Sequence, residues 1–543
     1  MKRIIFAIIV LFSAPQMLNA QYEDLVRGDS AYNEKNYEKA FEYLDKYYSD
    51  TTHGRSNWNC YEAAISACKT AHFDKAKHYF DAAAKIGFDY SYYSVLIKDT
   101  PNCLQTLPEW HSVISELEVK YDSVEAILKP IRNLLYDTSI RINQTALTDS
   151  SYWKNIGDAQ KLISKIKNFN AYPTPKKTGF WTLDTIKIDT LNVPFLLYIP
   201  SNYNPKEKNI LYVFLHGAVS GRKDFIYDAA PTIRQQNDLF KAAFKQNAFV
   251  LYPSARKDFN WLYHQKAFET ILNEIALVKS LYNIDDNKVY IGGHSDGARG
   301  TFWFAVNNRT TFAAFYPICY FPSVYTGNTE LFNLKNNQSI DGISDKGDNI
   351  FPLNMVDSVY DYAKEHGANW KNFVVNGEHS LPYDSPDSVY FIFDTVATKQ
   401  RNPFPKKIQW QTDNVINGRN YWLEITALDT TATRADWQQD LNPPITTKEG
   451  KHTKFNFNKN KSGAYIATID NNVVDIKTSC IKQLTFYASP ELINLKKPVK
   501  IYVNGKLVFN DIIKEDKNVI ADEFLKTKDK SLIVVNKIKI NVP

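Results

Sequence analysis

Ser295 is the residue whose surroundings most clearly suggest chemistry. It lies in Gly293-His294-Ser295-Asp296-Gly297, with one serine between two spaced glycines. Residues 288–291 before this pattern read as a strand, and "ARGTFWFAV" after it reads as the start of a helix. A sharp turn between strand and helix exposes a serine at a helix N-terminus, which favours developing negative charge. The pattern predicts a nucleophilic serine on a strained turn; the alternative is an inert turn serine.

A serine hydroxyl needs a base to attack a carbonyl, and the base needs an acid to orient it. Three histidines follow Ser295 in the chain: His366, His379 and His452. His366 ends a predicted helix and His452 falls in the C-terminal β segment. His379 follows the last predicted strand of the middle segment, where a loop can bring its ring to Ser295. We therefore predict His379 as the general base.

The acid is expected in the segment "DGISDKGDNIFP", which follows the strand before the one that leads to His379. This segment offers Asp341, Asp345 and Asp348. The spacing "DNIFP" favours Asp348, and counting from Gly342 gives Asp345 as the alternative. An aspartate of this loop that is not the acid would cap a turn or a helix.

Two backbone amides are expected to stabilise the oxyanion: that of Asp296, and one from Gly217 and Ala218 in the loop after "LYVFLHGA". The neighbouring His216 is predicted to shape this loop rather than to act as an acid or base. The segment "ARKDFNWLYHQK" is expected to line the site, with Trp261 as a candidate for stacking on substrate. The alternative for Trp261 is a buried core position.

Positioning these residues requires a mostly parallel sheet. Short apolar segments alternate with helix-length stretches, namely "ILYVFLHG", "AFVLYPS", "KVYIGGHS", "FAAFYPICYF", "SIDGIS" and "NFVVNGEH". Strands that alternate with helices predict a parallel sheet covered on both faces. Ahead of them, "WTLDTIKIDTLNVPFLLYIP" alternates as a hairpin does. We predict an α/β domain over residues 178–400.

The motifs "VFLHGA", "YNIDDNKVYIGGHSDGA" and "NGEH" together resemble extracellular α/β-hydrolase esterases, which include feruloyl and acetylxylan esterases and polyhydroxybutyrate depolymerases. The resemblance covers about residues 190–395. It implies an acyl-enzyme mechanism without metal or organic cofactor. "DNIFP" matches the Asp-x-x-x-Pro of this loop in many hydrolases, so the implied triad is Ser295, His379 and Asp348. A two-residue extension before Asp348 and Ala298 in place of glycine depart from the family pattern.

The segment before the α/β domain, residues 21–170, has helical periodicity and an internal repeat. Ala40 and Leu44 in the first stretch correspond to Ala76 and Phe80 in the second, 36 residues later. Small residues bracketed by aromatic ones resemble tetratricopeptide repeats, whose usual period is about 34 residues. Such a module would dock a protein or peptide partner; a helical spacer is the alternative.

The segment after the α/β domain, residues 408–543, alternates apolar and polar residues. Asn504-Gly505 between "KIYV" and "KLVF" predicts a tight hairpin, because type I′ turns need positive φ at both positions. We predict an antiparallel β-sandwich that supports the catalytic domain, with carbohydrate binding as the alternative. Proline-bearing linkers, "AYPTPKKT" at 171–178 and "RNPFPKK" at 401–407, separate the three segments.

Composition limits the class of protein. With 543 residues, 44% hydrophobic and 23% charged, the chain suits several globular domains, and its net charge of +6 forms no dense basic block that would indicate nucleic acid binding. Residues 1–20 have the layout of a signal peptide, so we expect a secreted or periplasmic protein without a later membrane span. Five cysteines without metal-type spacing are expected to be buried thiols, and no metal site is expected.

The sequence thus predicts an exported serine hydrolase that cleaves a small-molecule or carbohydrate ester. A peptidase related to prolyl oligopeptidases shares the order of the triad. A binding or scaffold protein on a hydrolase core is the third hypothesis, and it predicts loss of a triad member. The acyl group, the alcohol and the oligomeric state have no signature in the sequence.

Overall fold

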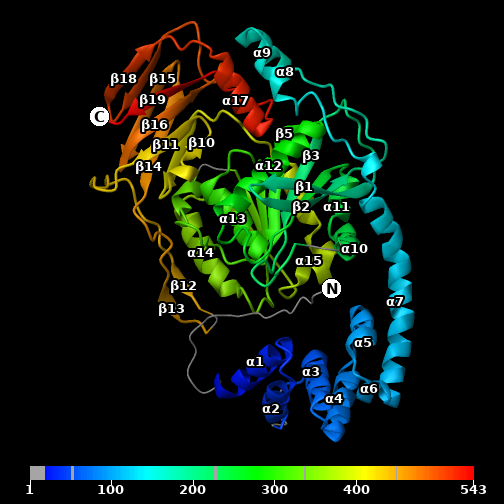
Figure 1. Ribbon diagram of the computed structural model, residues 1–543. Helices are drawn as coiled ribbons and strands as arrows, with labels where there is room; N and C mark the ends of the chain where they lie inside the picture. The colour runs from blue at the N-terminus through cyan, green and yellow to red at the C-terminus, as the bar shows by residue number, and fades with distance from the viewer. Residues whose placement is uncertain (1–18, 50–53, 226–228, 336–337, 448) are drawn as a thin grey trace. The chain divides into compact units, whose positions relative to one another are not determined.

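The computed structural model describes residues 19–49, 54–225, 229–335, 338–447 and 449–543. The predicted signal peptide, residues 1–20, lies outside these residues except for its last two positions. The chain divides between Arg132 and Asn133 into two compact units (Figure 1). Within the described residues, no helix is both long enough and apolar enough to cross a bilayer.

The first unit is built from helices, which run from blue to cyan in Figure 1. They are α1 (Asn19–Asn33), α2 (Tyr37–Tyr48), α3 (Asn57–Lys69), α4 (Phe73–Ile86), α5 (Tyr93–Asp99), α6 (Asn102–Gln105) and α7 (Pro108–Leu135), which continues into the second unit. The sequence repeat is visible in the backbone, because the α1–α2 and α3–α4 turns contain Lys35 and Ala71, both at φ 62°. Ala40 and Ala76 are buried in the helices that follow these turns.

The cysteines differ in part from the prediction. Cys68, near the end of α3, forms a disulfide with Cys103 in α6, and their Cα atoms are 6.3 Å apart. The prediction of buried thiols is wrong for this pair, because the fold of α4–α6 returns the chain to α3, which cysteine spacing does not reveal. Cys60, Cys319 and Cys480 are buried free thiols as predicted.

The second unit contains the predicted sheet. Its order is β1-β2-β4-β3-β5-β6-β7-β8. The β1–β2 and β2–β4 pairs are antiparallel and the others are parallel. The strands are β1 (Phe180–Ile188), β2 (Leu191–Ile199), β3 (Asn209–Leu215), β4 (Phe249–Pro253), β5 (Ile284–His294), β6 (Ala314–Ile318), β7 (Ile340–Asp345) and β8 (Trp370–Val375). The predicted hairpin is confirmed as β1–β2.

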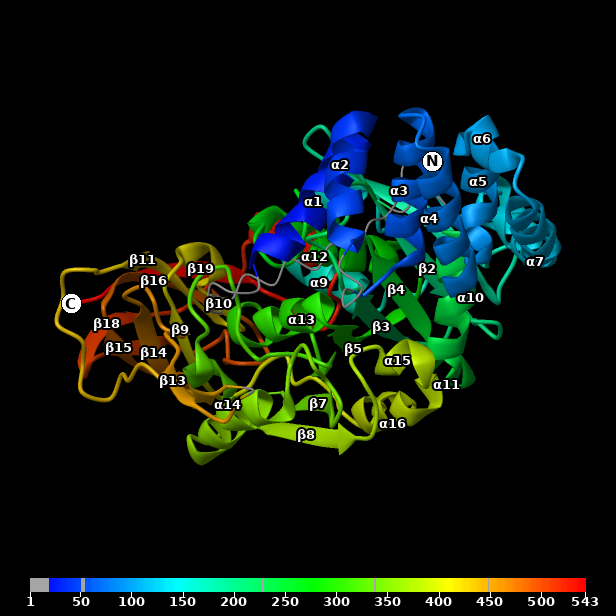
Figure 2. The same ribbon diagram turned by 90° about the horizontal axis from the view of Figure 1, so that it is seen from below.

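Helices cover both faces of this sheet because successive side chains of a buried strand point to opposite faces. Val213 of β3 packs in one core with Phe268 and Phe302, whereas the neighbouring Phe214 contacts Phe240 on the other face. The helices are α10 (Ala230–Leu239), α11 (Lys241–Lys245), α12 (Gln265–Leu281), α13 (Asp296–Asn307), α14 (Leu353–Glu365), α15 (Leu381–Asp384) and α16 (Phe391–Ala397). Figure 2 shows α10, α11, α15 and α16 grouped together.

The C-terminal part is a two-sheet sandwich, and one of its strand pairs differs from the prediction. One sheet has the order β10-β11-β16-β19 and the other β18-β17-β15-β14-β9. The β15–β17 pair is parallel, so the sandwich is not wholly antiparallel, because a crossover through β16 separates the two strands in the chain. Its strands are β9 (Lys407–Thr412), β10 (Arg419–Asn420), β11 (Leu423–Leu428), β14 (Gly463–Asp470), β15 (Val473–Ser479), β16 (Ile481–Ala488), β17 (Val499–Val503), β18 (Lys506–Asp511) and β19 (Asn536–Asn541).

The predicted Asn504-Gly505 turn is confirmed. It joins β17 to β18 with φ 50° at Asn504 and φ 80° at Gly505. A further hairpin, β12 (Pro444–Thr446) and β13 (His452–Lys454), leaves the sandwich and reaches α14, where the Thr446 amide donates to Ser358 Oγ at 3.0 Å. The sandwich therefore supplies a segment that packs directly on the α/β sheet's helices.

Two helices that the sequence grouped with residues 21–170 belong to the second unit. They are α8 (Ser150–Lys154) and α9 (Ala159–Lys167). Trp153 of α8 and Ile166 of α9 are buried in one core with Trp410 of β9 and Phe524 of α17 (Lys517–Thr527). Their apolar faces are covered by the sandwich, whose strands begin at Lys407, far along the chain.

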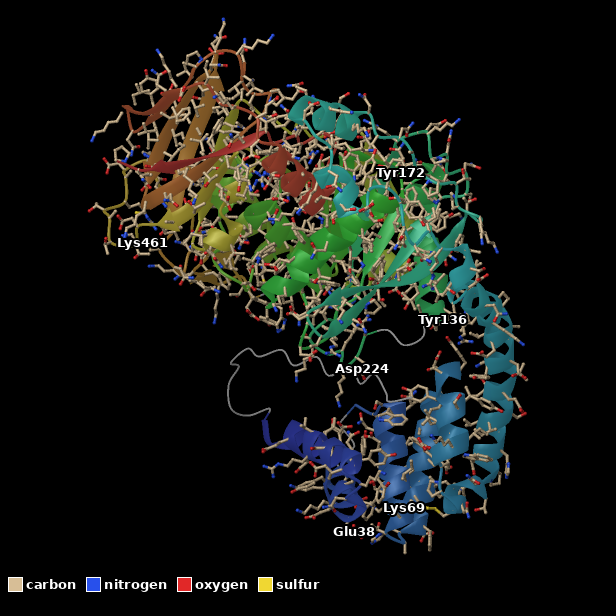
Figure 3. The ribbon with its side chains drawn as sticks, turned by 45° about the horizontal axis from the view of Figure 1, so that its top comes forward. Glu38, Lys69, Tyr136, Tyr172, Asp224 and Lys461 are labelled. Atoms are coloured by element: carbon tan, nitrogen blue, oxygen red, sulfur yellow. A yellow bond between two sulfur atoms is a disulfide. The ribbon has the colours of Figure 1, made fainter. Side chains whose placement is uncertain are left out.

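A buried ion cluster joins the α/β part to the sandwich. Arg401 forms a bidentate pair with Asp529 at 2.7 and 3.1 Å, and Lys279 of α12 pairs with Asp286 of β5 at 2.9 Å. Lys279 also lies 3.6 Å from Asp529. Tyr172, labelled in Figure 3, accepts a hydrogen bond from Lys530 at 2.8 Å. The segments predicted as linkers therefore carry buried contacts, because Tyr172 and Arg401 lie within them.

Candidate active site

Ser295 occupies the turn between β5 and α13. Its backbone has φ 57° and ψ −118°, a strained conformation for a residue with a side chain. The flanking glycines are needed because space is missing: a Cβ on Gly297 would overlap the carbonyl oxygen of Leu215, and one on Gly293 would lie 2.5 Å from the same atom. The turn thus has the geometry that presents a serine hydroxyl above the sheet edge.

His379 and Asp348 reach Ser295 from the loops after β8 and β7. Ser295 Oγ lies 2.9 Å from His379 Nε2, and His379 Nδ1 lies 2.8 Å from Asp348 Oδ2. A proton on Nδ1 donates to the carboxylate and leaves Nε2 free to accept the serine proton. The structure brings together the three residues that the resemblance implied.

The surroundings of Asp348 keep it ionised. Burial raises the pKa of its carboxyl, but the hydrogen bond from His379 and those from two backbone amides outweigh burial and lower the pKa below its usual value. The amides of Ile350 and Phe351 both donate to Oδ1 at 2.8 Å. Oδ1 is thereby held by the backbone while Oδ2 faces the imidazole.

Asp345, the alternative acid, has a different partner. Its Oδ2 accepts a hydrogen bond from Cys319 Sγ at 3.1 Å, and burial raises the pKa of its carboxyl. Cys319, Asp345 and Asp348 place one donor atom each within 4.8 Å, a grouping that could in principle hold a metal ion. Burial also raises the pKa of the Cys319 thiol, which keeps it protonated, and a protonated thiol is a poor ligand. The donor set therefore fits a thiol–carboxyl pair better than a metal centre.

The loop after β3 lies against the serine. A Cβ on Gly217 would be 3.0 Å from Ser295 Cβ, and Ala218 has φ 56°. Three backbone amides lie at this turn: those of Gly217, Ala218 and Asp296. Among the described residues, none of them donates a hydrogen bond to a backbone carbonyl in the turns, loops and helix ends. Donors in these positions are available to an oxyanion on an ester carbon bound at Ser295.

Two side chains hold that loop. The carboxylate of Asp296 accepts a hydrogen bond from the Val219 amide at 2.9 Å, so Asp296 serves the loop with its side chain. His216 Nδ1 donates to the Gly217 carbonyl at 2.9 Å, and its Nε2 accepts from the Ala255 amide at 3.1 Å. Burial lowers the pKa of His216 well below its usual value, so it stays neutral and shapes the loop, as predicted.

His294 has a role at this site that the sequence did not indicate. Its Nε2 donates to the backbone carbonyl of His379 at 2.5 Å. Burial lowers the pKa of His294 to about 4, so its neutral form makes this bond at neutral pH. The residue before the nucleophile therefore holds the loop that carries the base. Its position inside the five-residue pattern was the available signal.

Trp261 does not lie where substrate stacking requires. It is 2% exposed, packs edge-on against His216 with ring centres 4.9 Å apart, and limits the space beside Gly300. The prediction of a substrate-stacking role is wrong in this structure, because the indole is buried against His216 of the loop after β3. The exposed aromatic residue of the same segment is Tyr263, whose ring stacks on Tyr325 at 5.3 Å.

Comparisons with known proteins find solved structures that are similar to part of this chain. No protein-family model and no curated protein matches the chain. Similar structures include a thermostable esterase (20% identity, TM-score 0.34), which covers 41% of this chain and 63% of its own length. FphF, a fluorophosphonate-binding serine hydrolase of Staphylococcus aureus, is 14% identical with TM-score 0.34, covering 41% of this chain and 99% of its own.

A ferulic acid esterase is 14% identical with TM-score 0.34 and covers 40% of this chain and 97% of its own length. The overlaps involve less than half of the chain at low identity. They do not transfer an activity, which must be argued from the residues at Ser295.

Proposed function

We propose that this protein is a serine hydrolase that cleaves carboxylic esters through an acyl-enzyme. The observation that carries the proposal is the continuous chain of hydrogen bonds from Ser295 Oγ through His379 to Asp348, at 2.9 and 2.8 Å. The strained backbone of Ser295 and the neighbouring loop amides supply the rest of the machinery. A small-molecule or carbohydrate ester is the proposed substrate class.

The reaction follows from these positions. His379 Nε2 takes the proton of Ser295 Oγ as that oxygen bonds to the ester carbon, and the loop amides stabilise the resulting oxyanion. The imidazolium, stabilised by Asp348, then gives its proton to the departing alcohol and leaves an acyl-serine. Water attacks the acyl-serine with His379 again as base, which releases the acid and restores Ser295.

Paired substrates test the proposal. Purified protein and Ser295→Ala would be assayed on p-nitrophenyl acetate and on aminoacyl-p-nitroanilides, and both would be treated with a fluorophosphonate probe. We expect hydrolysis of the ester and labelling of the wild type only. Cleavage of the anilide alone would favour the peptidase hypothesis. Absence of both hydrolysis and labelling would leave the scaffold hypothesis.

We also propose that the protein is exported. The N-terminal pattern of residues 1–20 and the Cys68–Cys103 disulfide support this proposal, because disulfides persist mainly in oxidising compartments. The test is expression of the full chain in a bacterial host, followed by fractionation and non-reducing electrophoresis. A full-length reduced protein confined to the cytosol would overturn the proposal.

A further inference from the structure

Arg299 is a buried cation one helical turn beyond the nucleophile. Its backbone amide donates to the Ser295 carbonyl at 3.1 Å, and the residue is only 6% exposed. The guanidinium Nη1 donates to Ser323 Oγ at 2.9 Å and lies 3.4 Å from the Ser323 carbonyl. Ser323 belongs to the loop after β6, so Arg299 contacts a loop at the same sheet edge as the triad.

No carboxylate compensates this charge at contact distance. Arg299 forms no ion pair with any residue that the structure describes, and within the same residues its Nε and Nη2 donate no hydrogen bond. The carboxylate of Asp296, three residues before Arg299, attracts the guanidinium through its charge but forms no ion pair with it, and it accepts a hydrogen bond from the Val219 amide. Burying a guanidinium costs free energy unless an anion pairs with it. The edge formed by Nε and Nη2 is therefore available to a bound anion.

Aromatic rings surround the guanidinium. Its carbon lies 4.5 Å from the centre of the Tyr325 ring, 5.0 Å from Phe351 and 5.5 Å from Phe321. Phe351 also contacts His379 edge-on, with ring centres 5.4 Å apart, so Arg299 and His379 contact the same ring. Arg299 is therefore a neighbour of the reacting groups.

The same rings extend to the surface. Tyr263 and Tyr325 stack with ring centres 5.3 Å apart and planes 6° apart, and they are 55% and 41% exposed. Exposed parallel rings offer apolar faces to a bound molecule. A path of aromatic side chains thus connects solvent with the guanidinium beside Ser295.

We propose that Arg299 binds a carboxylate carried by the ester substrate, and that Tyr263 and Tyr325 pack on the carbon skeleton between that carboxylate and the solvent. This inference rests on the proposed ester hydrolase function. The guanidinium suits a carboxylate because its planar fork can bind both carboxylate oxygens at once. The preferred substrates are then esters that bear a free carboxylate near the scissile bond.

Matched ester pairs test the inference on the full chain. For a carboxylate on the acyl side, the pair is p-nitrophenyl hydrogen glutarate and p-nitrophenyl methyl glutarate. For one on the alcohol side, it is 3-acetoxybenzoate and its methyl ester. The quantity measured is the ratio of kcat/KM between the charged and neutral member, which is independent of the fraction of active enzyme.

We expect a ratio of about ten or more for one pair in the wild type, a ratio near one in Arg299→Gln, and an intermediate ratio in Arg299→Lys, which keeps the charge without the fork. Arg434→Gln is the matched control, because Arg434 lies between β11 and β12 and already pairs with Asp440 at 2.5 Å, and it should retain the wild-type ratio.

The outcomes separate the inference from the proposed function. Equal kcat/KM for both members of both pairs in the wild type, or a preference that survives Arg299→Gln, would overturn the inference while leaving an ester hydrolase. Failure to hydrolyse any ester, together with no fluorophosphonate labelling, would instead remove the proposed function. Should Arg299→Gln not fold, the wild-type ratio and that of Arg299→Lys decide: a lower ratio in Arg299→Lys supports the inference, and an unchanged ratio overturns it.

Discussion

His294 and His379 share one loop contact but have opposite requirements. In the proposed mechanism His379 exchanges a proton with Ser295, whereas His294 must stay neutral to donate its Nε2 proton to the His379 carbonyl. Burial separates these roles: His294 is 6% exposed, and the side chain of His379 is 19% exposed. The position before the nucleophile therefore controls where the base lies.

Protonation of His294 should destabilise the protein. Burial lowers its pKa from an unfolded value of about 6.5 to about 4, so the unfolded chain binds the proton more tightly. The stabilisation is complete above about pH 6.5 and is lost as the pH falls toward 4. The free energy of unfolding should therefore be lower by about 2 kcal/mol at pH 5 than at pH 7.

Urea unfolding at pH 7 and pH 5, followed by tryptophan fluorescence, measures this loss. His294→Gln retains a donor but cannot take up a proton, so its stability should fall less than that of the wild type between these two values. An equal fall in both proteins would show that other groups, such as the buried His216, account for the acid sensitivity.

The two loop aspartates should differ sharply in their effect on rate. Asp348→Asn removes the charge that stabilises the imidazolium and should lower kcat about 10³–10⁴-fold. Asp345→Asn replaces a carboxyl whose pKa burial has raised, and whose partner is Cys319, so we expect a change of less than about tenfold. Steady-state hydrolysis of p-nitrophenyl acetate compares the two, and the reverse order would assign the acid to Asp345.

At the scale of elements, the sequence predicted β5, the Ser295 turn and α13, because glycine spacing and apolar periodicity within a few residues determine them. Glycine spacing fixed the Ser295 turn, and loops after β7 and β8 meet at one sheet edge by topology. What lay beyond the sequence depends on long-range packing. Trp261 lies in a polar stretch of sequence that suggests exposure, yet it is buried against His216 of the loop after β3. Arg299 stands four residues after Ser295, a helical spacing that could have drawn attention to it.

The Ser295 turn should tolerate no added methyl group, whereas a glycine in open space should tolerate one. Gly297→Ala would drive a methyl group into the Leu215 carbonyl, which must displace β3 or the turn. We expect loss of ester hydrolysis and destabilisation of about 2 kcal/mol or more. Gly157→Ala is the control, because no atom lies within 4 Å of the added methyl group. Thermal melts and fluorophosphonate labelling check both, and a labelled, fully stable Gly297→Ala protein would contradict the crowding.

At the scale of the whole molecule, the sandwich is a structural partner of the α/β sheet rather than an attached module. Asp529 of the sandwich side is sandwiched between Arg401 and Lys279, and these side chains are 0–4% exposed. Helices α8 and α9 complete the sandwich core from the other end of the sequence. The proline-bearing segments suggested linkers because composition reports local stiffness, whereas burial of Tyr172 and Arg401 depends on what packs against them.

Removal of the shared anion should loosen both parts together. Burial raises the pKa of Asp529, but Arg401 and Lys279 outweigh burial and lower it, so the carboxylate is ionised at neutral pH. Asp529→Asn leaves Arg401 without its buried carboxylate partner and Lys279 with Asp286 alone, and it should cost about 3–5 kcal/mol. Glu491→Gln is the matched control. The ion pair of Glu491 with Lys167, at 2.6 Å, joins α9 to the sandwich but is half exposed, and its loss should cost less than about 1 kcal/mol.

Urea unfolding of both variants, followed by ester hydrolysis and by tryptophan fluorescence, gives a midpoint for each signal and measures the difference. If the ion cluster joins the parts, the two signals should shift together in Asp529→Asn; a shift of fluorescence alone, with hydrolysis as resistant as in Glu491→Gln, would show that the α/β part keeps its catalytic geometry without the sandwich.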